Sequence, residues 1–352
     1  MTIELSRRTM ALGLIAGASG VMFNDRSVAQ TGSLKNASNW STAPSLPIAV
    51  QEIYPVLFRG DIVVAGGFSP DDLEAEEGVT KRVFAWSPGQ PTWRELAPLP
   101  SAIHHPYLLE REGLLYAIGG FKLAAEGDWA MQSSVWVYDP QTNQWNIGPA
   151  MPLPIGETVG ASLNGNLHVM TGRRPSGAEN ASWRHHSDIN AHLILKQGAE
   201  DWTTARPAPT ARNSAASVVV GTNIHVIGGR TVSGGNVAVH EVYHTQTDEW
   251  TRLAPLPKAE KGPHGAGGLA SAVLNDTIYV FGGEWFDEDG GGVYHQIWAY
   301  DIAKDEWTDE GEMPTPRHGL GAVALNGKIY TIGGAAGVSG EGTSRLVEVF
   351  TP

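Results

Sequence analysis

Short apolar runs separated by glycine-rich turns follow one another along most of the chain. The segment "LGAVALNGKIYTIGG" (320–334) shows the unit clearly: an apolar run, a polar turn, a second apolar run and a glycine pair. Runs of this kind are typical of β-strands joined as hairpins. With 43 glycines and only 17% charged residues, the composition favours tight turns over solvated helices. The pattern therefore predicts an all-β fold.

The glycine motif is an internal repeat. It ends an apolar run six times, at Gly67, Gly120, Gly172, Gly229, Gly283 and Gly334, so that neighbouring motifs are 51 to 57 residues apart. A tryptophan recurs with the same rhythm, at Trp40, Trp93, Trp145, Trp202, Trp250 and Trp307. A fixed period of about 50 residues indicates one structural unit repeated around or along an axis.

Each repeat reads as four strands, here a to d. Strand a is an apolar run, strand b ends in the glycines, strand c resembles "VWVYDP" (135–140) and strand d carries the tryptophan. The sixth repeat ends with "LVEVFTP" (346–352) and has no strand d, whereas "NASNWSTAPSLP" (36–47) is a strand d without a, b or c. Pairing these two segments would close a ring and leave no open sheet edge.

The glycine pair after strand b and the tryptophan further on resemble the kelch repeat. The resemblance implies a six-bladed β-propeller over residues 30–352, closed by an N-terminal outer strand in the last blade. Repeat three departs most from the pattern, with "MTGRR" (170–174) in place of a glycine pair. Most glycines and tryptophans of the motif are expected to serve the fold: the glycines permit a sharp turn and the tryptophans pack between blades.

Residues 1–29 form a predicted targeting segment. Arg7 and Arg8 precede a short apolar run, and "SVA" (27–29) has the small residues of a cleavage site. The segment resembles a twin-arginine export signal, which implies a bacterial protein that is periplasmic or secreted and whose mature chain starts at Gln30. We expect no membrane span after the signal is removed.

Charge and cysteine content exclude several classes of function. The net charge of −13 argues against nucleic acid as a partner. The chain has no cysteine, which excludes disulfides, thiolate metal sites and a cysteine nucleophile. We expect a small-molecule or glycan ligand, and a protein partner remains open.

One face of the propeller is expected to carry the function. The a–b turns are minimal, whereas the b–c loops are long, as in 173–188 and 284–296. Long loops on a rigid scaffold commonly carry binding residues. The connections from d to a emerge on the same side. We align the six repeats on the glycine motif and allow one extra residue in the fourth turn. The positions that begin strand a are then Gln51-Glu52, His104-His105, Gly156-Glu157, Arg212-Asn213, Gly267-Gly268 and His318-Gly319.

These positions supply the candidate site. Glu157 and His318 are the candidate catalytic residues, because carboxylate and imidazole exchange protons. Arginines suit a ligand carboxylate, and a tryptophan can stack on a sugar ring. The candidate substrate-binding residues are Glu52, His104, His105, Arg173, Arg212, Arg230, His264, Glu284, Trp285, His295 and Arg317.

No cofactor and no metal are predicted. Adjacent histidines such as His104 and His105 point to opposite sides of a strand, and no metal-binding motif is present. A metal held by residues of different blades, for example His104, Glu157, His264 and His318, remains an open alternative.

An exported six-bladed kelch propeller is similar to the bacterial sialic acid mutarotases (N-acetylneuraminate epimerases), which interconvert the anomers of an acidic sugar. The resemblance implies an acidic carbohydrate at the channel mouth and isomerase activity. It carries over no catalytic residue, because no motif outside the repeat aligns. The alternative is a non-catalytic propeller that binds a glycan or a protein.

Overall fold

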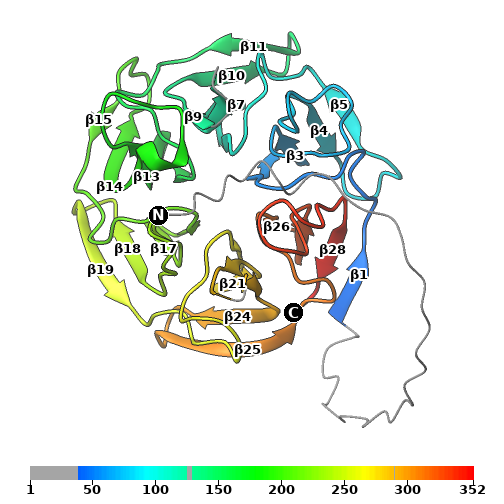
Figure 1. The fold of residues 1–352 in the computed structure, drawn as a ribbon, viewed down its shortest axis with the longest axis vertical. Coiled ribbons are helices and arrows are strands. Elements are labelled where there is room, and N and C mark those ends of the chain that lie inside the picture. The colour runs from blue at the N-terminus through cyan, green and yellow to red at the C-terminus, as the bar shows by residue number, and fades with distance from the viewer. Residues whose placement is uncertain (1–38, 125–128, 289) are drawn as a thin grey trace, which may run out of the picture. The chain divides into compact units, whose positions relative to one another are not determined.

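Six four-stranded antiparallel sheets surround a central axis in this computed structural model, which describes residues 39–124, 129–288 and 290–352 (Figure 1). The protein is a six-bladed β-propeller, as the repeat predicts. The predicted export signal at residues 1–29 lies outside the described residues. No helix among the described residues is long and apolar enough to cross a bilayer.

Each blade begins with its innermost strand, since the first strands of neighbouring blades contact one another around the channel. Blade one consists of β2 (Val56–Phe58), β3 (Asp61–Ala65), β4 (Val83–Trp86) and β5 (Arg94–Leu96). Blade two consists of β6 (Tyr107–Arg111), β7 (Leu114–Ile118), β10 (Val135–Asp139) and β11 (Gln144–Ile147). Blade three consists of β12 (Val159–Leu163), β13 (Asn166–Pro175), β14 (His186–Leu195) and β15 (Thr203–Thr204).

The second half of the ring repeats this order. Blade four consists of β16 (Ala216–Val220), β17 (Asn223–Ile227), β18 (His240–His244) and β19 (Glu249–Leu253). Blade five consists of β20 (Ala270–Leu274), β21 (Thr277–Phe281), β24 (Gln296–Asp301) and β25 (Glu306–Glu312). Blade six consists of β26 (Gly321–Leu325), β27 (Lys328–Ile332), β28 (Val347–Phe350) and, from the other end of the chain, β1 (Trp40–Thr42).

The ring closes as the split repeat predicts. Strand β1 pairs antiparallel with β28, with Trp40 opposite Phe350 and Thr42 opposite Glu348. Figure 1 shows the blue β1 beside the red β28. The Trp40 ring lies 5.1 Å from the Phe350 ring and 6.3 Å from the Phe281 ring of blade five. This strand therefore covers the edge of the last sheet, which would otherwise present unpaired backbone groups.

The repeated tryptophans join neighbouring blades. In five of the six repeats the indole Nε1 donates a hydrogen bond of 2.8–2.9 Å to a carbonyl in the connection that leaves the preceding blade. The donor and acceptor residues are Trp93 and Pro44, Trp145 and Ala97, Trp202 and Pro149, Trp250 and Arg206, and Trp307 and Ala254. Their role is structural, as expected.

Three additions to the basic blade lie between strands b and c. Hairpin β8–β9 (Phe121–Leu123 and Trp129–Met131) follows the glycines of blade two, and hairpin β22–β23 (Glu284–Trp285 and Gly292–Val293) follows those of blade five. In blade three, β13 and β14 run past the glycine motif with a bulge between Met170 and Gly172, and the short 3-10 helix η3 (Trp183–His185) joins them. These segments bring extra side chains to one face.

Candidate functional site

Each blade places two residues at one end of the channel through the same isolated backbone bridge. The bridge joins a residue before the innermost strand to the residue that follows the glycine motif. In chain order the bridged pairs are Gln51–Phe68, His104–Phe121, Gly156–Arg173, Asn213–Arg230, Gly267–Glu284 and His318–Ala335. The structure therefore brings the d–a connections and the b–c loops together, and the repeat itself fixes their register.

The expected alignment of the fourth blade is wrong by one residue. Asn213 bridges Arg230, so Asn213 and Ser214 occupy the positions that Arg212 and Asn213 were expected to fill. The physical reason is that the fourth turn holds no extra residue. The spacing from the glycine motif back to the bridge is the same in all six blades.

The residue after each bridge adopts a left-handed backbone conformation. Its φ lies between 47° and 66° at Glu52, His105, Glu157, Ser214, Gly268 and Gly319. Neighbours in this ring are joined by backbone hydrogen bonds of 2.6–3.1 Å, from Glu52 to Gly319, Gly319 to Gly268, Gly268 to Ser214 and Ser214 to Glu157. The conformation costs a non-glycine residue about 1–3 kcal/mol, and blades five and six avoid this cost with glycine. The four side chains are therefore kept despite strain, as is common at functional sites.

Side chains from these positions converge in a charged cluster, which is defined here as Glu52, His105, Glu157, Arg173, Ser214, Arg230, Glu284 and His318. They come from all six blade junctions: the fifth contributes Glu284 and the sixth His318, although the ring position after each of these two bridges is glycine. Seven of the eight belong to the residues predicted from the sequence.

Glu157 anchors the two arginines of the charged cluster. Its Oε2 lies 3.0 Å from Arg173 Nε and accepts a hydrogen bond of 2.7 Å from Ser214 Oγ, and its Oε1 lies 3.7 Å from Arg230 Nη2. Burial alone would raise the pKa of this carboxyl, but the two guanidinium groups outweigh burial and lower the pKa to about 2. Glu157 is therefore an ionised, fully enclosed anchor rather than a group that meets a ligand.

Arg230 connects Glu157 to Glu284. Its Nη1 donates a hydrogen bond to Glu284 Oε1, while Glu284 Oε2 accepts one of 3.0 Å from the backbone amide of Ser339 in the sixth blade. Burial works to lower the pKa of Arg230, and the carboxylates of Glu157 and Glu284 overcome burial and raise it. The Arg173 side chain is 10% exposed and that of Arg230 12%, so both side chains are accessible in part.

Glu52 lies between two imidazoles. Its Oε2 is 2.7 Å from His105 Nε2, and its Oε1 is 3.5 Å from His318 Nδ1. Although burial opposes ionisation, both imidazoles lower the pKa of Glu52 well below its usual value. Burial also works against a charge on His318, yet the contacts with Glu52 and Glu284 raise its pKa. The Glu52 side chain is 12% exposed and His318 is fully buried, so Glu52 is the member of this pair that faces the mouth.

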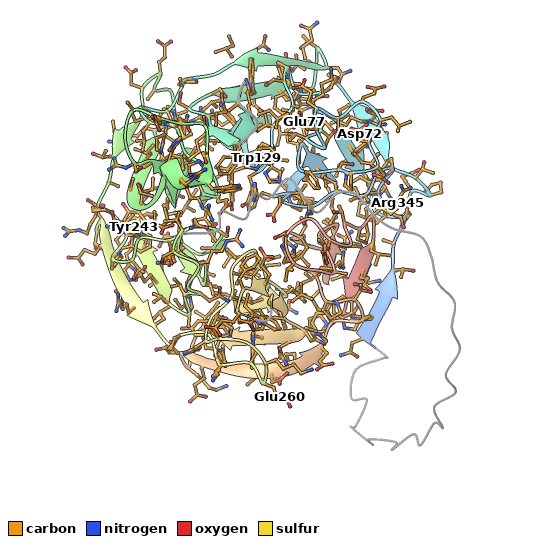
Figure 2. The ribbon with its side chains drawn as sticks, in the orientation of Figure 1. Asp72, Glu77, Trp129, Tyr243, Glu260 and Arg345 are labelled. Atoms are coloured by element: carbon orange, nitrogen blue, oxygen red, sulfur yellow. The ribbon has the colours of Figure 1, made fainter. Side chains whose placement is uncertain are left out.

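Aromatic rings lie beside His105 and Arg173 of the charged cluster. His104 contacts His105 Nδ1 through its own Nδ1 at 3.0 Å and stacks on Trp129 with ring centroids 4.8 Å apart. The Arg173 guanidinium lies 4.7 Å from the ring centroid of Trp183. Figure 2 shows Trp129 on the inner side of the ring of blades. Burial lowers the pKa of His104 to about 3, so this histidine acts as a neutral ring beside the cluster.

Arg212 and Arg317 do not face the channel mouth, contrary to expectation. Both side chains are fully buried inside their own blades, where Arg212 pairs with Glu241 and Arg317 pairs with Glu348. Each arginine directly precedes a bridge residue, and successive residues of an extended segment point to opposite sides. Their role is to hold strand c against the start of strand a.

Three other predicted residues lie apart from the charged cluster. His264 is exposed, and its Nε2 contacts the Leu256 carbonyl at 2.6 Å. Trp285 packs within its own hairpin, with its ring centroid 4.6 Å from that of Tyr294. His295 is exposed and directly precedes β24. The alternative metal site of His104, Glu157, His264 and His318 therefore does not form. His264 lies apart from the other three, and Glu157 is bound to the arginines.

Sequence reasoning missed Ser214, which is a member of the charged cluster, and Tyr54, which lies next to the cluster. Ser214 holds Glu157, and a strict count from the glycine motif would have found it. Tyr54 lines a cavity of about 90 Å³ between the innermost strands, together with Tyr107 and Ser217. Burial, with help from the negative charges of Glu52 and Glu157, raises the pKa of Tyr54 well above its usual value, so it stays neutral beneath the cluster.

Known proteins match the chain over much of its length. A protein-family model for the KLHDC2/KLHL20/DRC7 Kelch-repeats domain matches residues 161–347, and a model for the Kelch motif matches residues 111–152. Kelch-like protein terF of Aspergillus terreus is 28% identical over 354 residues, which cover 98% of this chain and 73% of that protein. Kelch-like protein 23 of Homo sapiens is 28% identical over 221 residues, which cover 62% of this chain and 36% of that protein.

A solved structure shows the same fold. The structure of YjhT superposes with a TM-score of 0.72 at 18% sequence identity, over 88% of this chain and 97% of that chain. At this level of identity the likeness concerns the fold alone.

Proposed function

We propose a function for this chain, which belongs to the KLHDC2/KLHL20/DRC7 Kelch-repeats domain family: it binds a small acidic carbohydrate at the charged cluster and interconverts the anomers of that sugar. One observation carries the proposal. Ionisable side chains from separate blades converge within contact distance at one end of the channel, and several of them occupy strained backbone positions. A purely structural propeller could place glycine there, as blades five and six do.

The arginines suit the acidic group of the ligand. Glu157 lies within ion-pair distance of both Arg173 and Arg230, and each arginine keeps a small part of its side chain exposed. Guanidinium groups bind carboxylates through charge-assisted hydrogen bonds. Trp183 beside Arg173 and Trp129 beside His104 offer flat apolar surfaces, against which a sugar ring can pack. The ligand is accordingly a ring with a carboxylate.

Glu52 suits proton transfer. Opening a cyclic sugar moves the proton of the anomeric hydroxyl to a base and protonates the ring oxygen, and closing the ring reverses both transfers. Glu52 is the partly exposed carboxylate, and it contacts His105 on one oxygen and His318 on the other. A carboxylate between two imidazoles can exchange protons with both. His318 then serves as a buried proton store behind Glu52, and Glu157 positions the arginines.

Export to the periplasm or beyond the cell belongs to the same proposal. It rests on Arg7, Arg8 and the apolar run that follows, and on the "SVA" cleavage pattern. A propeller that folds before export would reach its sugar substrate outside the cytoplasm.

The direct test measures anomer exchange by NMR with N-acetylneuraminate and glucuronate, and uses glucose as the neutral comparison. We expect faster exchange of an acidic sugar, a loss of rate of about a hundredfold in Glu52→Gln with binding retained, and binding that is about ten- to a hundredfold weaker in Arg173→Ala. The matched control is Lys328→Ala, at the exposed first position of β27.

The outcomes separate the two parts of the proposal. Binding of the acidic sugars without faster exchange would favour a non-catalytic glycan-binding propeller. Equal binding of glucose and the acidic sugars, or weaker binding in Lys328→Ala, would remove the case for the charged cluster. Melting temperatures of the variants, measured in parallel, show whether each variant is folded.

A further inference from the structure

His318 has an unusual environment for a buried histidine. The residue is fully buried, and neither ring nitrogen makes a hydrogen bond among the described residues. Its Nδ1 instead points between two carboxylates, 3.5 Å from Glu52 Oε1 and 3.4 Å from Glu284 Oε1. Both distances exceed the 2.7–3.2 Å of an ordinary N–H···O hydrogen bond. A buried polar group without a hydrogen-bond partner is costly, which indicates that a ligand binds between His318 and the two carboxylates.

The spacing of the three donor atoms fits a metal ion. The donor atoms of Glu52, Glu284 and His318 all lie within 4.8 Å of one another. Ligands about 2.1 Å from a tetrahedral ion are about 3.4 Å apart, which is the separation of His318 Nδ1 from each carboxylate oxygen. One imidazole and two carboxylates form a donor set that first-row divalent ions such as Zn²⁺ accept.

The charge balance leaves room for a cation. Three carboxylates of the charged cluster face only two guanidinium groups, and both arginines contact Glu157. Glu52 forms no ion pair within 4.0 Å with an arginine or lysine in the described part of the chain; its ion pairs are to imidazoles. Arg230 uses one lone pair of Glu284 Oε1, and a carboxylate oxygen has a second.

Supporting contacts hold the three ligands in place. Glu52 Oε2 is fixed by His105 at 2.7 Å and Glu284 Oε2 by the Ser339 amide at 3.0 Å, so each carboxylate turns its other oxygen toward His318. The backbone of His318 is bridged to Ala335. Such outer contacts orient ligands in metal sites.

We propose that Glu52, Glu284 and His318 bind one divalent transition-metal ion. The site joins blades one, five and six, so an ion there ties the N-terminal part of the ring to its C-terminal part. This inference goes beyond the carbohydrate proposal but shares Glu52 and His318 with it, since a bound ion would occupy His318 Nδ1 in place of a proton. Its test uses no sugar, so failure to bind metal is distinguishable from failure of the carbohydrate proposal.

The test titrates the chelator-treated chain with Co²⁺, followed by visible absorption, and with Zn²⁺ by calorimetry. We expect binding of one equivalent, a Co²⁺ spectrum typical of low coordination number, and affinity lower by about tenfold or more in His318→Asn and Glu52→Gln. The control, His295→Asn, removes an exposed histidine outside the cluster and should bind like the unmodified chain.

Three results would overturn the proposal: no Co²⁺ spectrum in the unmodified chain, an unchanged spectrum in a folded His318→Asn variant, or loss of binding in His295→Asn. Circular dichroism establishes folding in each case. Should His318→Asn fail to fold, Glu52→Gln decides the matter, because the Glu52 side chain is partly exposed and its amide keeps the same shape.

Discussion

Arg317 donates a hydrogen bond of 2.7 Å to Glu348 in the interior of blade six. Arg212 makes the equivalent contact with Glu241 in blade four. In both blades an arginine one residue before the bridge reaches a glutamate on strand c, and the arginine is fully buried. These ion pairs are part of the scaffold, although their position next to the mouth made them look like ligand-binding residues in the sequence.

Breaking the Arg317–Glu348 pair from one side should strongly destabilise the protein. Arg317→Met leaves Glu348 buried without its cation, and we expect the free energy of unfolding to fall by about 3–5 kcal/mol. The double variant Arg317→Met/Glu348→Met should regain much of this loss, because no buried charge remains. Urea unfolding followed by tryptophan fluorescence measures both effects.

The exposed Lys304–Asp301 pair provides the control, with side chains 68% and 38% exposed. Removing it with Lys304→Met should change stability by about 1 kcal/mol or less. An Arg317→Met variant that is as stable as Lys304→Met would show that the buried pair contributes nothing.

Closure of the ring should depend on β1. A chain that begins at Ile48 lacks the strand that covers β28, so the edge of blade six is open. We expect this chain to aggregate or to melt at a clearly lower temperature than one that begins at Gln30. Size-exclusion chromatography and thermal unfolding compare the two. Equal melting temperatures and a monomeric shortened chain would contradict the closing role of β1.

The protein should lose stability in mild acid. Five buried histidines have pKa values that burial lowers to about 3 or 4: His104, His168, His192, His225 and His240. The unfolded chain takes up protons at these groups below about pH 6.5, whereas the folded chain stays neutral there until pH 3 to 4. Their contribution to the free energy of unfolding is therefore complete above about pH 6.5 and falls as the pH drops from there toward the folded-state pKa values of about 3 to 4.

Glu157 and His318 add contributions of opposite sign. Glu157, whose pKa falls to about 2, adds a second loss below about pH 4.5. His318 acts in the opposite sense, since its raised pKa gives stability that is present below about pH 6.5 and is lost as the pH rises through the folded value. Five histidines outweigh one, so the net effect is loss in acid.

Urea unfolding at about pH 7 and about pH 5 tests this expectation. His192→Gln should show a smaller difference between the two pH values than the unmodified chain, because one protonation site of the unfolded state is gone. His295→Gln, at an exposed position, should keep the full difference. Stability that is the same at both pH values would disprove the histidine account.

Export should require the twin arginines. Replacing Arg7 and Arg8 by lysine keeps the charge but removes the pair that the twin-arginine route reads. We expect the precursor to accumulate in the cytoplasm of a bacterial host, with a shorter mature form only for the unmodified chain. Fractionation followed by mass determination of the N-terminus measures both, and normal export of the double-lysine variant would rule out this route.

The sequence by itself determined the architecture. The glycine motif, the tryptophans and the split repeat are local, periodic signals, and each marks a contact that recurs in every blade. The sixth repeat has no strand d after Val347–Phe350, so the isolated strand at Trp40 had one missing position to fill. These contacts require particular residue types at a fixed spacing, so the six blades and their closure can be predicted from the sequence.

Only the tertiary structure decided which polar residues meet. A shift of one residue in an extended segment moves a side chain to the opposite face, and this separates Arg212 in the blade interior from the mouth positions Asn213 and Ser214. Glu52 and His318 are far apart in the chain, yet the closed ring places them 3.5 Å apart. The sequence marked where polar residues gather, and the register of each blade selected those that converge.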